Sequence, residues 1–225
     1  MSMHPGLALS PHQNGCDRIN AIARRIRRDV TDSLLFFGRW LRDPAGMASI
    51  APSGRALAAL ITRGIDGRMG PVLELGSGTG AFVPALLERG VAEDDLTLVE
   101  RDLSLARLLT QRYPRARVLS IDATNVHDST SGPLFGAVVC GLGLLNMRPE
   151  EVEAILSATL QRMKPDAQFY LFTYGRRCSV PHDMRQRLRL DAERVGTAWR
   201  NFPPAAVFRI GRSEPSAADH PGQRQ

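Results

Sequence analysis

Apolar residues early in the chain recur at helical spacing. This spacing places them on one face of a helix, or on one face of each of two helices separated near residues 31–33. The apolar residues of this face are Ile19, Ile22, Ile26, Val30, Leu34, Phe37 and Leu41. A further helix is predicted at residues 54–63, after turns in "RDPAG" and "APSG", with Ser53 as its N-cap.

From residue 72 onward, short apolar runs alternate with amphipathic segments. The runs predict strands at residues 72–75, 96–100, 116–122 (core 118–121), 137–141 and 169–173, and a final strand at 206–210. The amphipathic segments predict helices at residues 82–88, 103–112, 149–162 and 181–194. Because each parallel connection must cross a face of the sheet, the alternation predicts an α/β fold with a mostly parallel sheet and helices on both faces.

The same pattern predicts the organisation of the chain. Residues 1–16 and 213–225 lack periodicity and are expected to be disordered. Residues 17–63 form an N-terminal amphipathic helical extension, which serves as a membrane or lid segment, and residues 64–212 form the core. A chain of 225 residues is long enough for one such domain.

The charge favours anionic partners. Lysine and arginine number 29 against 23 acids, which gives a net charge of +6, and the pI is near 10.0. Phosphate, nucleic acid and lipid surfaces all remain open on this ground. Residues 17–42 hold seven arginines and three acids, so four of the six net positive charges lie in the amphipathic segment.

The three cysteines are widely spaced and odd in number, which indicates neither a disulfide framework nor a zinc site; they are Cys16, Cys140 and Cys178. We expect no metal. No signal peptide is recognisable, and the longest apolar runs, such as residues 137–145, fall well short of the roughly 20 residues that span a bilayer. A cytoplasmic protein, peripheral to the inner face of the cell membrane, is therefore expected.

Three closely spaced glycines follow the first predicted strand, in "VLELGSGTGAFVPALLERG" (residues 72–90). Glycine lets a loop turn sharply and lets a ligand approach the backbone without meeting a Cβ, here beside the positive N-terminus of a helix. Pro84 falls in the first turn of that helix, where a missing N–H costs little. The strand, loop and helix therefore predict a ligand-binding site at the loop.

The spacing E-x-G-x-G-x-G resembles motif I of the class I S-adenosylmethionine-dependent methyltransferases, and differs from the G-x-G-x-x-G of dinucleotide enzymes. The resemblance implies a Rossmann-like fold whose glycine loop carries the amino acid part of S-adenosylmethionine. It also implies that Glu100, 24 residues after Gly76, takes the ribose hydroxyls, and that Asp122-Ala123 holds the adenine amino group. The cofactor-binding residues so predicted are Glu74, Gly76, Ser77, Gly78, Thr79, Gly80, Glu100, Arg101, Asp122, Ala123 and Gly141.

Two of these residues also have purely structural interpretations. Glu74 can be a buried carboxylate that organises the loop, and Asp122 can be a helix cap.

Stretches outside the cofactor half resemble the soluble, peripheral type of bacterial phospholipid N-methyltransferase, which methylates phosphatidylethanolamine. The matching stretches are "FFGRWLRDPAGMASIAPSGRALA", "ELGSGTG" with "ALLERGV", "GLGLLN", "FTYG" and "RNFPPAAV", across residues 36–208. The resemblance implies N-methylation of the phosphatidylethanolamine headgroup, and of its mono- and dimethyl forms, towards phosphatidylcholine. Ser77 and Gly143 depart from it, since proline is expected at both positions.

A lipid acceptor suits the basic amphipathic segment, whose apolar face can enter the headgroup region while its arginines meet anionic lipid. The predicted membrane-binding residues are Arg24, Arg25, Ile26, Arg27, Arg28, Phe36, Phe37 and Trp40. The alternative is a helix that covers the sheet and keeps its arginines solvated.

Methyl transfer to an amine needs a neutral lone pair, and a partly dry pocket beside a cationic cofactor lowers the pKa of the amine. The candidates for holding the headgroup are Tyr174, Asn146 and Asn201. A tyrosine face attracts a cationic headgroup through cation–π interaction. Their structural alternatives are a packing residue, a cap and a turn former. Arg176 and Arg177 are candidates for the lipid phosphate, and no general base is assigned.

Other functions compete with this one. One rival is an RNA or protein N-methyltransferase, in which the basic helix could bind a phosphate backbone. The chain reads "VVCGLGLLNM" after the fourth predicted strand, where base N-methyltransferases carry a motif that binds the planar amino group of the base. An aromatic content of 6% also leaves few side chains on which bases could stack. The complete glycine loop disfavours a non-catalytic membrane protein, and its spacing disfavours a nicotinamide oxidoreductase. An ornithine-type aminolipid stays open as acceptor. We expect an anionic membrane surface and a phospholipid substrate as partners, no nucleic acid and no obligate protein partner.

Overall fold

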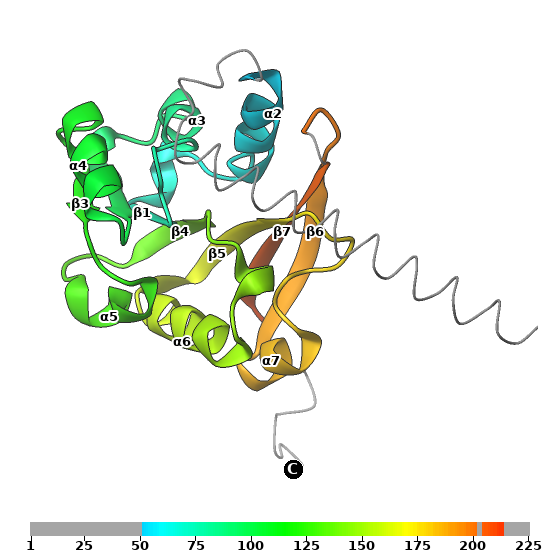
Figure 1. The fold of residues 1–225 in the computed structure, drawn as a ribbon. Coiled ribbons are helices and arrows are strands. Elements are labelled where there is room, and N and C mark those ends of the chain that lie inside the picture. The colour runs from blue at the N-terminus through cyan, green and yellow to red at the C-terminus, as the bar shows by residue number, and fades with distance from the viewer. Residues whose placement is uncertain (1–50, 202–203, 214–225) are drawn as a thin grey trace, which may run out of the picture. The chain divides into compact units, whose positions relative to one another are not determined.

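The computed structural model describes residues 51–201 and 204–213, which form layers of helices around a central sheet (Figure 1). The strands are β1 (Val72–Leu75), β2 (Leu96–Val99), β3 (Arg117–Leu119), β4 (Phe135–Cys140), β5 (Met163–Thr173), β6 (Leu190–Ala198) and β7 (Ala205–Arg212). The helices are α2 (Ala51–Ile61), α3 (Val83–Glu88), α4 (Leu103–Arg112), α5 (Val126–Ser129), α6 (Pro149–Leu160) and α7 (His182–Arg187). Short 3-10 turns are η2 (Gly67–Met69), η3 (Glu93–Asp95), η4 (Ala123–Asn125) and η5 (Leu144–Asn146).

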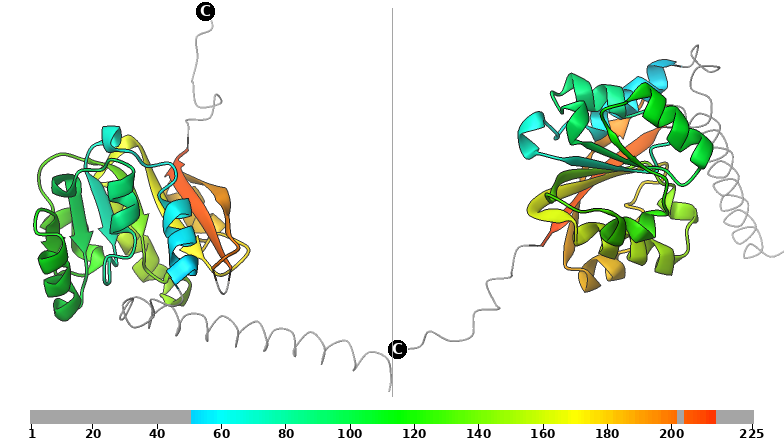
Figure 2. Two further views of the ribbon diagram at one scale, coloured as in Figure 1. Left: turned by 90° about the horizontal axis from the view of Figure 1, so that it is seen from above. Right: turned by 90° about the vertical axis from the view of Figure 1, so that its left-hand side faces the viewer.

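Within the described residues the sheet has seven strands in the order β3-β2-β1-β4-β5-β7-β6. The first five of these in space pair in parallel, whereas β7 runs antiparallel to both β5 and β6. Figures 1 and 2 show α2, α3 and α4 on one face of the sheet and α5, α6 and α7 on the other. The mostly parallel sheet with helices on both faces is therefore confirmed.

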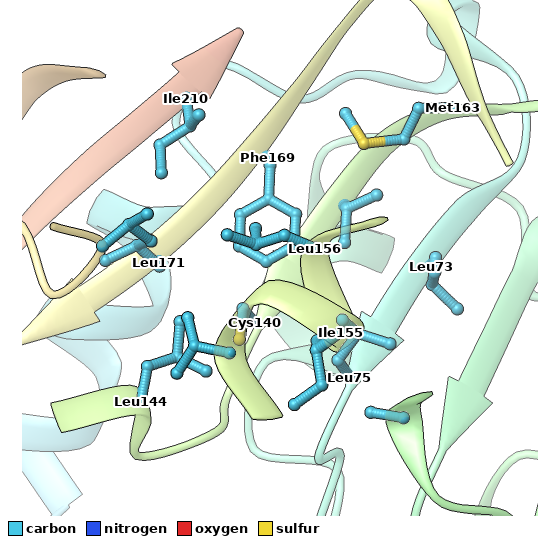
Figure 3. Packing of buried hydrophobic residues seen from close by; sticks show 14 of the residues in the cluster. Leu73, Leu75, Cys140, Leu144, Ile155, Leu156, Met163, Phe169, Leu171 and Ile210 are labelled. Atoms are coloured by element: carbon cyan, nitrogen blue, oxygen red, sulfur yellow. The ribbon is translucent and has the colours of Figure 1, made fainter. Parts of the chain in front are cut away.

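The core lies where the central strands meet α6 (Figure 3). Leu73 and Leu75 of β1, Phe169 of β5, and Ile155 and Leu156 of α6 are each at most 2% exposed. Fully burying one such side chain stabilises the fold by about 1.5–3 kcal/mol. Strands β1, β2 and β4 are buried along their whole length, and this explains why they are mostly apolar; Glu74 in β1 and Thr97 in β2 are buried polar exceptions.

Capping residues set where two helices begin. The Asp102 side chain accepts hydrogen bonds from the backbone N–H groups of Ser104 and Leu105, so it caps α4 at the predicted start of that helix. Pro149 occupies the first turn of α6, where no intrahelical N–H is needed. Both helices begin at the residue predicted from the sequence.

The prediction of one helix over residues 181–194 is wrong in its second half. The helix α7 ends at Arg187, Arg189 adopts a left-handed φ of 52°, and the chain continues as strand β6. The antiparallel ladder with β7 supplies backbone hydrogen bonds that outweigh the helical preference of this charged segment.

Smaller differences concern element boundaries. The helix α2 begins at Ala51, so Ser53 lies inside it rather than at its N-cap. Strand β3 is shorter than the predicted 116–122, and strand β5 begins at Met163, well before the predicted residue 169. The predictions for residues 1–50 lie outside the described residues.

The five parallel strands end at one edge of the sheet, which we call the carboxyl edge. Because β7 is antiparallel to β5, its first residues lie there too, with Ala206 opposite Thr173. Ala198 at the end of β6 pairs with Ala205. The turn between β6 and β7 is therefore at the carboxyl edge, together with the loops that follow β1 to β5.

Candidate functional site

The glycine loop leaves β1 in a conformation that needs glycine. Gly76, Gly78 and Gly80 have φ values of 66°, 56° and 81°, where an L-residue meets steric strain. A Cβ on Gly76 would lie 2.5 Å from Leu142 Cδ2, and a Cβ on Gly80 would lie 2.7 Å from Tyr113 Cε2. Both backbone strain and close packing therefore hold the loop in its shape.

Neighbouring elements anchor the loop. The backbone N–H groups of Gly76 and Ser77 donate to Val99 O at 2.9 and 3.0 Å, and the Ser77 hydroxyl donates to Glu74 O at 3.2 Å. Arg112, at the end of α4, donates from Nη1 to Thr79 O at 3.0 Å. The loop is thus fixed before any ligand binds.

Glu100 immediately follows β2 and lies against the same loop. Its Oε2 accepts from Gly78 N, and its Oε1 accepts from Asp102 N, both at 2.8 Å. Each carboxylate oxygen has a further lone pair, so the group can still accept hydrogen bonds from two neighbouring hydroxyls. The structure places Glu100 beside the glycine loop, as the prediction requires.

Glu74 is a buried carboxyl directly beneath this arrangement. It is 1% exposed, and its Oε2 has no hydrogen-bond partner among the described residues. Burial, with a smaller contribution from the charge of Glu100, raises the pKa of Glu74 to about 8, so the carboxyl is largely protonated at pH 7.

The Thr79 hydroxyl is likewise buried without a partner among the described residues. Two buried polar groups without a described partner, one before and one within the glycine loop, indicate a polar ligand at this position. The residues of the loop therefore fit the amino acid part of S-adenosylmethionine.

Asp122 lies in the loop after β3, directly before η4. Its Oδ1 accepts from the backbone N–H and the hydroxyl of Thr124, at 3.0 and 2.8 Å, so it caps the turn η4. These hydrogen bonds lower the pKa of Asp122. Its Oδ2 lies 3.5 Å from Nη1 of the exposed Arg101. The capping role is thus observed, and the predicted adenine contact stays a prediction.

Two further predicted residues line the same region. Ala123 is buried after β3, and Gly141 is buried after β4. Gly141 N donates to Leu75 O at 2.8 Å, and a Cβ on Gly141 would lie 2.7 Å from Gly76 O. Glycine at 141 thus lets the loop after β4 lie directly against the glycine loop.

Of the three headgroup candidates, the structure brings two together. Asn201 is 8% exposed, and its side chain is hydrogen-bonded to Tyr174. Burial raises the pKa of Tyr174 to about 12, with the bond to Asn201 acting in the opposite direction. Asn146 is exposed at the end of η5, on the neighbouring loop of the carboxyl edge.

A series of aromatic rings links this pair to the glycine loop. The Tyr174 and Phe172 rings pack edge to face with centroids 5.7 Å apart, and Phe172 packs the same way on Phe82 at 6.1 Å. Phe82 is the N-cap residue of α3, immediately after the loop. The headgroup candidates and the cofactor candidates are thus connected through packed side chains.

Sequence reasoning missed several residues that shape this site, namely Phe82, Asp102, Arg112, Tyr113 and Leu142. Arg112 and Tyr113 were visible only as the end of a predicted helix, and nothing local indicates that this end meets the glycine loop. Asp102 alone had a local signal, as an acidic residue immediately before a predicted helix.

The described residues do not test the remaining site predictions. The predicted membrane-binding residues, all between 24 and 40, lie outside the described residues. Among residues 51–201 and 204–213, no three His, Cys, Asp or Glu side chains gather as a metal site would require. In the same part of the chain, no helix is both long enough and apolar enough to cross a bilayer.

Comparisons with known proteins bear on the family and the fold. No protein-family model matches the chain. The ornithine lipid N-methyltransferase of Singulisphaera acidiphila is 31% identical over 188 residues, which are 80% of this chain and 95% of that protein.

Two solved structures illustrate the likeness of the fold. One is the TehB-like SAM-dependent methyltransferase of Corynebacterium glutamicum, with a TM-score of 0.57 and 19% identity. The other is the N-methyltransferase NodS of Bradyrhizobium japonicum with S-adenosyl-L-homocysteine, with a TM-score of 0.56 and 14% identity. Each similarity covers 81% of this chain and 99% of the other. The fold is that of the class I S-adenosylmethionine-dependent methyltransferases, and the chain belongs to the methyltransferase family of the Singulisphaera acidiphila ornithine lipid N-methyltransferase.

Proposed function

We propose that this protein N-methylates the amine headgroup of a membrane aminolipid, with S-adenosylmethionine as its cofactor and S-adenosylhomocysteine as product. The observation that carries the lipid acceptor is the similarity to the ornithine lipid N-methyltransferase. It extends over most of both chains, so it includes the residues outside the cofactor half.

Two headgroups are candidates. An ornithine-type lipid comes first, because of that relative. Phosphatidylethanolamine comes second, because stretches such as "RNFPPAAV" resemble the phospholipid N-methyltransferases. Both present a primary amine near an acidic group, and the exposed Arg176 and Arg177 suit a carboxylate or a phosphate equally well.

Different residues of the chain bind the cofactor and orient the amine. When bound, S-adenosylmethionine supplies an electrophilic methyl group. The glycine loop and Glu100 hold the cofactor in place, and Tyr174 and Asn201 orient the amine. Tyr174 remains a neutral phenol at physiological pH, because its pKa is about 12. It can therefore accept a hydrogen bond from an amine N–H and offer its ring face to a cation, without acting as a base.

The test supplies methyl-labelled S-adenosylmethionine with four parallel samples: vesicles containing an ornithine lipid, vesicles containing phosphatidylethanolamine, total RNA, and buffer. We expect label in the lipid extract, and chromatography of the headgroups gives the number of methyl groups added. Label in only one of the two lipids identifies the acceptor. Label confined to the RNA would contradict an aminolipid acceptor.

We also propose that the protein binds membranes peripherally through its N-terminal basic segment. The test replaces four arginines of this segment with glutamine, namely Arg24, Arg25, Arg27 and Arg28. This variant should no longer bind anionic vesicles, and its affinity for S-adenosylhomocysteine should be unchanged. Undiminished vesicle binding in a sedimentation assay would exclude a membrane role for that face.

A further inference from the structure

The carboxyl edge bears exposed apolar and basic side chains beside Tyr174 and Asn201. We name this group the edge patch; it consists of Leu145, Arg176, Arg177, Trp199 and Arg200, all exposed. Trp199 is 77% exposed and Leu145 is 45% exposed. Within the described residues, Trp199 is the most exposed large apolar side chain, and tryptophan is enriched at membrane interfaces because its ring is apolar while its N–H is polar.

Three loops bring the edge patch together. The hydrogen bond between Tyr174 and Asn201 joins the loop after β5 to the turn between β6 and β7. A Cβ on Gly175 would lie 4.0 Å from Leu145 Cδ1, so the loop after β4 reaches the same place. The patch is therefore one surface, built from segments distant in the sequence.

The charged side chains of these three loops are all positive. Residues 141–148, 174–181 and 199–204 contain four arginines and no acidic residue. Arg148 forms an ion pair with Glu151, and the three arginines of the edge patch have no ion pair with any described residue. Unneutralised guanidinium groups around an exposed indole match an anionic lipid surface, where arginine binds phosphate and tryptophan lies at headgroup level.

We infer that the edge patch docks on an anionic bilayer, with Trp199 and Leu145 at headgroup depth and its arginines on lipid phosphates. The inference rests on the proposed aminolipid acceptor and extends it, because docking through this surface would turn Tyr174 and Asn201 towards the lipid. Each arginine near such a surface is worth a factor of about five in membrane partitioning.

The fluorescence of Trp199 gives a direct test. The chain has two tryptophans, so Trp40→Phe leaves Trp199 as the sole indole and keeps an aromatic ring at position 40; sedimentation with vesicles checks that this variant still binds. With vesicles of phosphatidylglycerol and phosphatidylcholine, we expect the emission to move to shorter wavelength and to be quenched by lipids brominated near the headgroup. Emission that stays as in buffer while the protein sediments with the vesicles would overturn the inference.

Two variants then separate docking from chemistry. Arg200→Gln should weaken vesicle binding about fivefold, and Trp199→Ala should weaken it further. Both should slow methylation of aminolipid in vesicles but not in detergent micelles. Arg107→Gln is the matched control, because Arg107 is exposed on α4, which packs beside β3 at the other end of the sheet. An equal loss in Arg107→Gln would show that only net charge matters, and would contradict a defined docking surface.

The remaining outcomes distinguish this inference from the proposed function. If no aminolipid is methylated in vesicles or micelles while the Trp199 emission still shifts, the proposed function fails and the docking surface stands. If RNA shifts the emission and vesicles do not, the patch binds a nucleic acid backbone and the inference is wrong.

Discussion

The buried carboxyl of Glu74 makes the stability of the protein depend on pH in a predictable way. In the unfolded chain a glutamate ionises near pH 4.5, whereas in the folded protein the pKa of Glu74 is about 8. Between these values the unfolded state gives up a proton that the folded state keeps. Stability contributed by this group is therefore lost as the pH rises from about 4.5 to about 8, and the loss is complete above that.

Replacing Glu74 with glutamine removes this proton linkage. The difference in unfolding free energy between Glu74→Gln and the native protein should grow by about 1.4 kcal/mol per pH unit in favour of the variant. Between pH 5.5 and 7.5 that is on the order of 3 kcal/mol, or on the order of 10 °C in Tm for a chain of this size. The whole pKa shift of Glu74, from 4.5 to about 8, corresponds to on the order of 5 kcal/mol of unfolding free energy.

The assay is thermal and urea unfolding without cofactor, at half-unit steps from pH 5 to pH 9. A second variant, Glu74→Leu, also removes the ionisation, so it should show the same slope with a different constant offset. A difference that stays flat with pH in both variants would mean that Glu74 ionises in the folded protein near its ordinary pKa, and the account of its burial would be wrong.

The other predictions concern the glycine loop and its supports. Glu100→Ala should weaken S-adenosylhomocysteine binding at least tenfold by calorimetry, about 1.4 kcal/mol, and unchanged affinity would move the cofactor site elsewhere. Gly80→Ala and Gly90→Ala both place alanine at a φ of +81°, which costs about 1 kcal/mol. Only Gly80→Ala also meets Tyr113, so it should lower the Tm further, and equal losses would exclude that packing role. Arg112→Ala removes a hydrogen bond to a loop carbonyl, so it should weaken S-adenosylhomocysteine up to about tenfold while the fold persists; full affinity would mean that the loop holds its shape unaided.

The cofactor half could be predicted because its signals are local. Strands β1, β2 and β4 are buried on both faces, so their sequences are mostly apolar. The glycine spacing lies within seven residues, and Glu100 and Asp122 are the last residues of two predicted strands. Because parallel strands end at one edge, these residues had to lie near each other once the sheet was assumed.

The acceptor half could not be predicted in the same way. The segment "LDAERVGTA" forms β6 at the end of the sheet order, where partial exposure gives no regular alternation and its charged residues favour a helix. Its pairing with β7 decides the structure, and that pairing is not local. Asn201 was predicted as a headgroup candidate, but nothing in the sequence places it beside Tyr174; the antiparallel hairpin of β6 and β7 brings the two together.

The strand order therefore divides the carboxyl edge by function. The order reverses between β1 and β4, where Gly141 lies against Gly76, and open α/β sheets bind ligands at such a reversal. The cofactor candidates lie mostly after β1, β2 and β3, and the headgroup candidates lie after β4 and β5 and in the β6–β7 turn.

This division predicts that variants on the two sides act on different kinetic parameters. Glu100→Ala should weaken S-adenosylhomocysteine binding whichever acceptor is used. Tyr174→Phe removes a hydroxyl that would hold the amine, so it should raise the KM for aminolipid several-fold and leave S-adenosylhomocysteine affinity within a factor of two. The ring contact between Phe172 and Tyr174 survives in that variant, so the packing towards Phe82 is retained. An equal loss of cofactor affinity in Tyr174→Phe would show that the hydroxyl supports the cofactor side, and the boundary between β1 and β4 would then not separate the two functions.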